Sequence, residues 1–438
     1  GCAPASVDNS AMPSFGATLP SVSVPIDGTP AADNTFANPT ATVNFANPNA
    51  VQITELEYFQ TGTQLQVIAK LQNLYSDAIL RDVQLEILAL DSSGNRIAQQ
   101  FRAVKYVFPD ETTGLVENLD LQPGLEADSV EVRVNDGIID RQLRYQQPLK
   151  ITGTAAFYNE SSASLTGWLE NQDPYTYTQV LLNAIAYNAR GEIIGGGLAA
   201  TEFVPANDKM GVQVAVTLSE TPTVVEIYPW ITLASTSLPG GTWWDTISVK
   251  DWNFLLTPDH LVIGGAELLN NSDALLAQSF YILTVSDTNG QVCLVDKGSI
   301  DYLWPGESLH FSPGILTAPS DSEPKNVDLI IVPGEFSQLP LRYNPLMISQ
   351  ASLSSDEGEL FVDVRVINNL NASISETIVY VNLLDENGQI VGGGKASSAA
   401  VNANSAFQVA VPVAGLGNWE KFTITASVTL PQSAQIGQ

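Results

Sequence analysis

Alternating apolar residues recur along most of the chain and predict short β-strands. Every second residue is apolar in Leu65-x-Val67-x-Ala69-x-Leu71, and again in Leu360-x-Val362-x-Val364-x-Val366. Because successive side chains of a strand point to opposite faces, this alternation gives one buried and one solvated face. Patterns with the period of an α-helix are nearly absent. We therefore predict an all-β protein.

One hairpin pattern occurs four times at nearly constant spacing. A strand leads into Asp/Asn-x-x-Gly and then into a second apolar strand, and the four turns are Asp91–Gly94, Asn188–Gly191, Asp287–Gly290 and Asp385–Gly388. Their glycines are 97, 99 and 98 residues apart. The Asp or Asn starts a turn, and the Gly supplies the positive φ that reverses the chain. We interpret the chain as four repeats, each centred on a β-hairpin.

The strands around each hairpin indicate the fold of a repeat. About 20 residues before each turn glycine an asparagine ends an earlier strand, at Asn73, Asn171, Asn271 and Asn369. Later alternating runs complete about six or seven short strands per hundred residues, with frequent turns. This density is typical of an immunoglobulin-like β-sandwich. We predict four tandem sandwiches.

The repeats alternate in type. The second and fourth carry Gly-Gly-Gly after the hairpin, at 195–197 and 392–394, whereas the first and third end in Leu-Arg-Tyr, at 143–145 and 341–343. The chain is therefore predicted to be a duplicated two-domain module, A-B-A-B. We expect Arg144, Tyr145, Arg342 and Tyr343 to hold A against B, with the tyrosines packed into the junction and the arginines paired nearby.

These patterns set the domain boundaries. We place the sandwiches at 50–146, 147–234, 252–344 and 345–438, with a junction at 235–251 and a largely extended linker at 1–49. The junction contains Leu238-Pro239-Gly240-Gly241, unlike the A–B connectors, so two stiff pairs could hinge there.

Composition narrows the classes of partner. The chain has 18 Lys and Arg against 47 Asp and Glu, for a formal net charge of −29. Such a chain repels phosphate backbones and anionic headgroups, which argues against nucleic-acid binding. No Cys/His cluster has the spacing of a metal or haem site, so we expect no cofactor.

The N-terminus predicts export and anchoring. Gly1-Cys2 is similar to the end of a bacterial lipobox, and the Pro-rich, polar stretch that follows is typical of a spacer. We predict a lipid on Cys2 as the one attachment to a membrane, the alternative being an ordinary thiol after a cloning remnant. The doublet Phe36-Ala37-Asn38-Pro39 and Phe45-Ala46-Asn47-Pro48 offers Phe36 and Phe45 as candidates for strand addition to a neighbouring copy, or as segments packed on the first domain.

The repeat resembles the FxLYD-type domain, an immunoglobulin-like sandwich of exported proteins that are often lipoproteins. Val381-Asn382-Leu383-Leu384-Asp385 and Pro305-Gly306-Glu307-Ser308-Leu309-His310-Phe311 carry the resemblance best. Only the second repeat has the tyrosine, Tyr187, and there Asn188 replaces the aspartate. The resemblance implies a structural or adhesive role at the cell surface and no catalytic residues.

Few side chains suggest chemistry. His260 and His310 lie in one repeat beside Asp259 and Glu307, but their spacing does not fit a set of metal ligands. We predict that Cys293 is a buried or half-buried thiol. Trp230, Trp243, Trp244 and Trp252 fall close together near the 235–251 junction. They would either fill that junction or bind a glycan or a protein partner. We therefore expect a non-enzymatic surface stalk or assembly subunit, and alternatively a binding module for a glycan or an envelope partner at these tryptophans.

Overall fold

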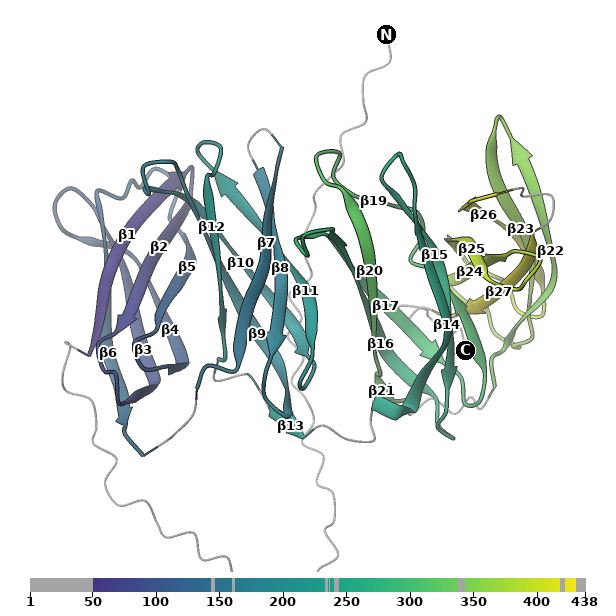
Figure 1. Ribbon diagram of the computed structural model, residues 1–438, viewed down its shortest axis with the longest axis horizontal. Helices are drawn as coiled ribbons and strands as arrows, with labels where there is room; N and C mark the ends of the chain where they lie inside the picture. Colours follow the sequence, from purple (N-terminus) through teal and green to yellow (C-terminus); the bar gives the residue numbers. More distant parts are fainter. Residues whose placement is uncertain are drawn as a thin grey trace, which may run out of the picture. The chain divides into compact units, whose positions relative to one another are not determined.

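The computed structural model describes residues 50–142, 146–159, 162–232, 235, 237–239, 244–337, 343–417 and 422–430 (Figure 1). These residues form an all-β protein of six antiparallel sheets, in which the one helical element is a three-residue 3-10 turn. We divide them by sheet into segment I (50–142), segment II (146–239), segment III (244–337) and segment IV (343–430). All four belong to one compact unit, residues 42–438. The predictions for Cys2, Phe36 and Phe45 lie outside the described residues.

Segment I consists of two three-stranded sheets, ordered β1-β2-β5 and β4-β3-β6. Leu85 and Ile87 of β3 point into the shared core, while Gln84 and Glu86 point outward, as the alternation predicts. The strands are β1 (Val51–Thr61), β2 (Gln64–Asn73), β3 (Ile79–Leu90), β4 (Arg96–Val107), β5 (Thr112–Asp120) and β6 (Ser129–Asp140).

Segment III repeats this arrangement, with sheets β14-β15-β18 and β17-β16-β20. Two short strands add to it, β19 on β15 and β21 on β16. Its elements are η1 (Trp244–Thr246), β14 (Ile247–Leu256), β15 (Leu261–Asn270), β16 (Leu276–Asp287), β17 (Val292–Leu303), β18 (Ser308–Phe311), β19 (Leu316–Thr317), β20 (Pro324–Val332) and β21 (Glu335–Phe336).

Segments II and IV differ because each forms one continuous sheet. The strand orders are β12-β9-β10-β11-β8-β7, with β13 on β9, and β22-β23-β26-β25-β24-β27. The two ends of each sheet approach each other, so each is a nearly closed barrel. The strands of segment II are β7 (Leu149–Asn159), β8 (Ser162–Asn171), β9 (Tyr175–Tyr187), β10 (Ile193–Val204), β11 (Lys209–Leu218), β12 (Val224–Trp230) and β13 (Ser237–Pro239). Those of segment IV are β22 (Leu346–Asp356), β23 (Glu359–Asn368), β24 (Thr377–Leu384), β25 (Ile390–Ser398), β26 (Ala406–Gly415) and β27 (Thr423–Thr429).

The Gly-Gly-Gly triplets produce this difference. A Cβ on Gly195 would lie 2.1 Å from the carbonyl oxygen of Thr217, and one on Gly394 would lie 2.0 Å from that of Pro412. Only glycine lets β10 come close enough to pair with β11, and β25 with β26. Segment I carries Ala98-Gln99-Gln100 at the equivalent place, and its two sheets stay separate.

The predicted hairpin turns are confirmed at all four positions. The turn glycines Gly94, Gly191, Gly290 and Gly388 have φ between 76° and 81°. Each glycine N–H donates to the carbonyl of the Asp or Asn that starts its turn. In three turns the starting aspartate also accepts backbone N–H bonds, which lower the pKa of Asp91 and Asp385.

A buried asparagine joins the two halves of every segment. Asn73 at the end of β2 donates to the carbonyl oxygens of Ala78, Val107 and Phe108, and its own oxygen accepts from Tyr75 N. Asn171, Asn270 and Asn368 repeat this set of bonds, and these four asparagines are at most 2% exposed.

Two of the predicted asparagines were therefore wrong by one position. Asn271 and Asn369 follow the buried residues Asn270 and Asn368 and point to the other face. Adjacent strand residues face opposite sides, so only the first of each Asn-Asn pair can enter the core. The correct four lie 21, 20, 20 and 20 residues before their turn glycines.

Replacing Asn368 with Ala should destabilise the protein strongly. The change removes the donor to Ala372 O and Asn402 O and the acceptor of Leu370 N, which leaves buried backbone groups unpaired. We expect a loss of about 2–4 kcal/mol in the free energy of unfolding. Denaturant unfolding followed by tryptophan fluorescence measures it. The neighbouring exposed Asn369→Ala is the control, and equal losses for the two variants would contradict the assignment.

Candidate functional site at the segment interfaces

Trp230 belongs to the protein interior. It lies at the end of β12 in segment II, is 3% exposed, and packs on the core of segment I. Its Nε1 donates to Thr113 Oγ1 of β5 at 2.7 Å. A ligand- or partner-binding role of Trp230 stays a prediction, and the buried indole lies against segment I and not in the junction after segment II. It anchors the I–II interface.

The other predicted tryptophans do not form a described binding surface with it. Trp252 on β14 is 44% exposed, and its ring centre lies 6.2 Å from that of Phe254. Trp244 begins the 3-10 turn η1, and Trp243 lies outside the described residues. Of the two whose side chains the structure describes, one is buried and one is half-exposed, so they offer no common aromatic platform.

Tyr343 is the one predicted connector residue that the structure describes. Tyr343 is 82% exposed, so it does not pack into the junction. The next residue, Asn344, turns inward instead and donates to Val428 O at 2.8 Å and to Glu307 Oε1 at 3.3 Å. Arg144, Tyr145 and Arg342 lie outside the described residues.

The same connector bond occurs in both pairs of segments. Gln147 Nε2 donates to Glu111 Oε1 at 2.8 Å, as Asn344 does to Glu307. In each case the amide oxygen accepts the N–H of the leucine two residues later, Leu149 or Leu346. Sequence reasoning missed these residues, although each connector has an amide side chain two residues before its leucine.

The I–II interface also holds a cation in an apolar setting. Lys70 Nζ lies 2.9 Å from Glu226 Oε2 and 5.0 Å above the ring of Tyr187. Burial alone would lower the pKa of Lys70, but the Tyr187 hydroxyl and the Glu226 carboxylate raise it above its usual value. Around this pair, Ile68 and Val116 of segment I pack against Ile185 and Ile193 of segment II.

The III–IV interface is held by amides and aromatic rings. Asn382 Nδ2 donates to Ala266 O at 3.1 Å, and Asn253 Nδ2 donates to Ile390 O at 2.7 Å. The ring of Phe311 lies 4.7 Å from that of Tyr281 and 5.5 Å from that of Tyr380. His310 lies on the same strand as Phe311, and burial lowers its pKa, opposed by the nearby Glu267.

Segments II and III also contact each other directly. The hairpin tip of segment III supplies two carbonyl acceptors: Trp168 Nε1 donates to Gly290 O at 3.0 Å, and Thr166 Oγ1 donates to Val292 O. Gly211 N donates to Thr284 Oγ1 at 3.1 Å. All three segment boundaries are therefore packed interfaces.

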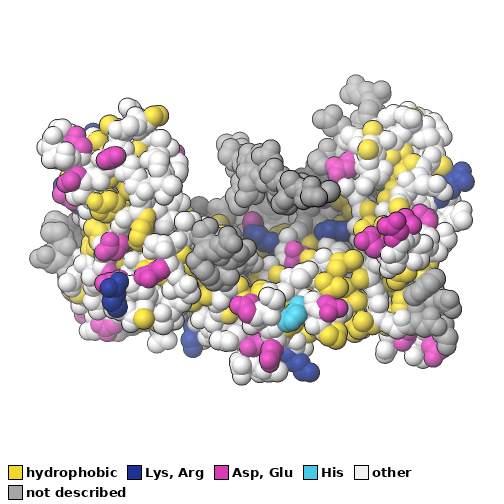
Figure 2. Space-filling model, turned by 90° about the horizontal axis from the view of Figure 1, so that it is seen from above, with side chains coloured by type: hydrophobic (Ala, Val, Ile, Leu, Met, Phe, Trp, Pro, Cys, Tyr) yellow, Lys and Arg dark blue, Asp and Glu magenta, His cyan; other side chains and the backbone are white. Residues whose placement is uncertain are grey.

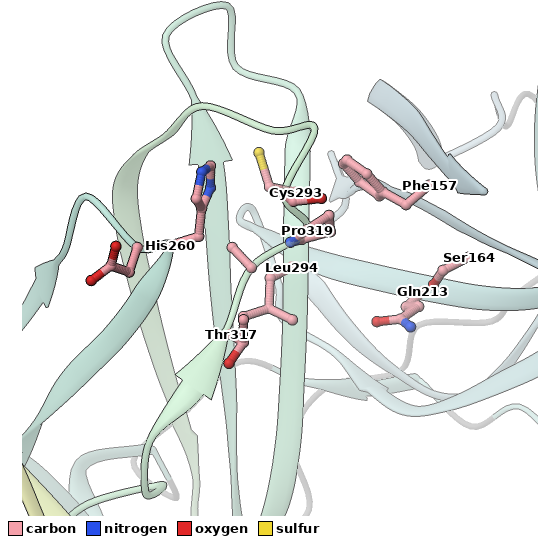
Figure 3. A pocket seen from close by; sticks show the side chains of 11 residues that line it. Phe157, Ser164, Gln213, His260, Cys293, Leu294, Thr317 and Pro319 are labelled. Atoms are coloured by element: carbon pink, nitrogen blue, oxygen red, sulfur yellow. The ribbon is translucent and has the colours of Figure 1, made fainter. Parts of the chain in front are cut away.

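Open clefts run along this II–III interface. One of about 470 Å³ lies between Phe157, Ser164 and Gln213 of segment II and Cys293, Leu294, Thr317 and Pro319 of segment III (Figure 3). Two more, of about 680 and 620 Å³, flank the turn Asp287–Gly290. These clefts leave parts of the II–III interface open to solvent.

Cys293 and His260 line the first cleft, and burial makes Cys293 poorly suited to act as a nucleophile. Cys293 is 3% exposed, which confirms the predicted buried thiol, and burial raises its pKa, so the thiolate is disfavoured. His260 ends a turn with a φ of 61°, and its backbone carbonyl oxygen accepts a hydrogen bond from the N–H of Ala318. Within the described residues no three His, Cys, Asp or Glu side chains are grouped closely enough to hold a metal ion.

The visible surface is more acidic than basic. In Figure 2, acidic side chains are scattered among uncharged ones, with few basic side chains between them. Among the described residues no helix is long and apolar enough to cross a membrane.

Comparison with known proteins assigns no family. No family model matches the chain, and no curated protein matches it. A beta-glucuronidase from glycoside hydrolase family 2 is 8% identical, with 86% of this chain and 75% of that chain covered and a TM-score of 0.15. The native conformation of E. coli alpha-2-macroglobulin is 10% identical, with 85% and 28% covered and a TM-score of 0.12. At these TM-scores neither likeness bears on fold or function, and the FxLYD resemblance stays a prediction from the residues quoted for it.

Removing the Trp168 hydrogen bond should expose Cys293. Trp168→Phe keeps an aromatic ring but loses the donor to Gly290 O. If this bond contributes about 1 kcal/mol, the II–III interface opens about fivefold more often. In a Cys2→Ser background, the rate of Cys293 reaction with a thiol reagent measures the opening. Trp304→Phe is the control because Trp304 Nε1 has no hydrogen-bond partner in the described structure. Equal rates for the two variants would contradict this role of Trp168.

Glu111 should make stability depend on pH near neutrality. Burial raises the pKa of Glu111 to about 7, although the Phe108 N–H and the Gln147 amide act against the shift. The folded protein then binds this proton more tightly than the unfolded chain, so the stability Glu111 gives at low pH is lost as pH rises from 4.5 to 7. The melting temperature of Glu111→Gln should therefore fall less between pH 4.5 and 7 than that of the wild type. The exposed Glu126→Gln should keep the wild-type slope, and an unchanged slope in Glu111→Gln would disprove the assignment.

Proposed function

We propose that this protein is a non-catalytic structural protein of the cell surface. It is built from four immunoglobulin-like β-sandwich domains in the order A-B-A-B, which correspond to segments I to IV. The two-sheet segments I and III are the A domains. The continuous-sheet segments II and IV, joined through their glycine triplets, are the B domains.

The observation that carries this proposal is the use of polar side chains at the boundaries. Trp230, Asn382 and Trp168 each donate a hydrogen bond across a segment boundary, one at each of the three boundaries. Buried donors of this kind fix direction as well as distance, because an unpaired partner is costly. A protein whose function is to hold domains in a set relation to each other needs this arrangement.

Attachment to the cell follows from the N-terminal residues. A lipid on Cys2 would be the one membrane contact, and residues 1–49 would form the spacer between the lipid and the first domain. The acidic surface suits an exported protein that stays soluble beside an anionic membrane. A polymeric form, with Phe36 or Phe45 in a strand donated to a neighbour, is the variant of this role.

A binding module for a glycan or an envelope partner is the second candidate, with weaker support. Of the predicted tryptophans with a described side chain, Trp252 alone is accessible, at 44% exposed. One exposed indole can stack on a sugar ring, but it provides little specificity alone.

Electron microscopy of the native, cell-derived protein with intact-mass analysis tests the proposal. We expect separate four-domain particles and the mass of a diacylglycerol on Cys2, and the Cys2→Ser variant should leave the membrane fraction. Fibres would favour the polymeric variant. An unmodified Cys2 in a protein recovered inside the cell would disprove the surface role, and glycan binding abolished by Trp252→Ala would favour the binding module.

A further inference from the structure

The II–III interface has one half on segment II and the other on segment III. Because the segments alternate A-B-A-B, segment I carries the counterpart of the segment III half, and segment IV carries the counterpart of the segment II half. The sheet β17-β16-β20 of segment III, which contacts segment II, corresponds to β4-β3-β6 of segment I. The sheet half of segment II that contacts segment III, with β8 and β11, corresponds to β23 and β26 of segment IV. We call the outward residues of β3, β4 and β6 the segment I end face, and those of β23 and β26 the segment IV end face.

Strand register makes the correspondence residue by residue. Ile282 pairs with Lys297 and Ile330, and Glu86 pairs with Phe101 and Arg133 in the same manner. In segments II and IV, Gly211 pairs with Trp168 as Gln408 pairs with Arg365. These strand positions of the II–III interface therefore each have one identified counterpart on an end face.

On the segment III side the interface is apolar. Ile282 is buried within the core cluster of segment II, and Phe280, Val295 and Ile330 pack against the same cluster. On the segment II side the space is closed to larger side chains. A Cβ on Gly211 would lie 2.4 Å from Thr284 Oγ1 and 2.9 Å from Val295 Cγ2.

The segment I end face replaces all four apolar residues with polar ones. Gln84, Glu86, Gln99 and Arg133 stand where segment III has Phe280, Ile282, Val295 and Ile330. Three of these side chains are already paired within the sheet: Gln99 donates to Glu86 Oε1, and Arg133 forms an ion pair with Glu131. Covering them with another protein surface would remove their hydration without giving new partners.

The segment IV end face is altered in the same direction. Asp363, Arg365 and Gln408 stand where segment II has Thr166, Trp168 and Gly211. Asp363 is held by Ser354 Oγ at 2.8 Å, and Arg365 and Gln408 are exposed. The Gln408 side chain occupies the space that Gly211 must leave empty, so a copy of segment III could not seat there.

Two apolar residues on the segment I end face do not restore the interface. Leu88 is 5% exposed and so offers almost no surface to a second copy. Phe101, 56% exposed, lines a groove of about 440 Å³ with Leu181 and Ala200 of segment II. Neither supplies the continuous apolar surface that Phe280, Ile282, Val295 and Ile330 form.

We propose that the two polar end faces terminate the array, so that copies of this chain do not stack end to end through the II–III type of contact. Terminal repeats of stacked-repeat proteins need a polar outer face for the same physical reason. A heterologous contact that repeats from copy to copy would otherwise give an open filament. The inference concerns the folded chain alone and does not depend on its cellular location.

Exchanging the end faces tests the proposal. One variant carries Gln84→Phe, Glu86→Ile, Gln99→Val and Arg133→Ile, a second carries Asp363→Thr, Arg365→Trp and Gln408→Gly, and a third combines both sets. We expect sedimentation velocity to give monomers for the wild type and for either single-face variant. The combined variant should show a mass that rises severalfold with concentration. The single-face variants control for general stickiness, because each lacks the complementary face.

Two outcomes would overturn the proposal. One is a combined variant that keeps the wild-type near-ultraviolet circular dichroism and melting temperature but stays monomeric at all concentrations. The other is end-to-end contact in the wild-type faces. It would appear as efficient disulfide formation between copies carrying Gln99→Cys and Gln408→Cys in a Cys2→Ser, Cys293→Ser background, because the counterparts of these residues, Val295 and Gly211, are in contact. This second measurement does not use the combined variant, so it tests the proposal even if that variant fails to fold.

Discussion

A buried amide closes the same end of each segment, and the remaining architecture is built around it. Asn73, Asn171, Asn270 and Asn368 each lie at the end of a strand where the chain leaves one half of its segment for the other. There the backbone must turn without water, so its carbonyl groups need donors from elsewhere. One asparagine supplies two donors and an acceptor at a single point, which no apolar residue can do. In each segment this crossing lies 20 or 21 residues before the glycine of the hairpin turn.

The difference between the two kinds of segment has a simple physical origin. Where three glycines follow the hairpin, the strand approaches its neighbour across the sheet edge and the two halves join. Where side chains stand there instead, as at Ala98 and Gln99, the halves remain separate and are held together by their cores and by the asparagine. A single local feature of composition therefore decides whether a segment has two sheets or one.

The sequence was most informative where backbone geometry restricts the residue type. The hairpin turns, with glycine φ near 80°, and the all-β character were predictable because each rests on a local pattern. The interfaces were not. Trp230 and Tyr343 looked alike as aromatic residues near junctions, yet one is 3% and the other 82% exposed. Trp230 ends a strand that packs against segment I, about a hundred residues earlier in the chain. No local pattern around either aromatic residue shows such a distant contact. The connector amides Gln147 and Asn344 were missed because an amide in a loop resembles any other polar residue until its partner is known.

The contrast between interior and terminal faces also limits how such a chain could change in length. If the whole chain were duplicated head to tail, Gln408 of the first copy would meet Gln99 of the second, and Arg365 would meet the hairpin turn at Gly94. That boundary would lack a packed core. A module inserted between segments II and III would instead meet compatible partners on both sides, provided that its A domain carried the face of segment III and its B domain that of segment II. Growth of this architecture is therefore favoured from its middle, and the outer segments would be kept at the ends however many domains lay between them.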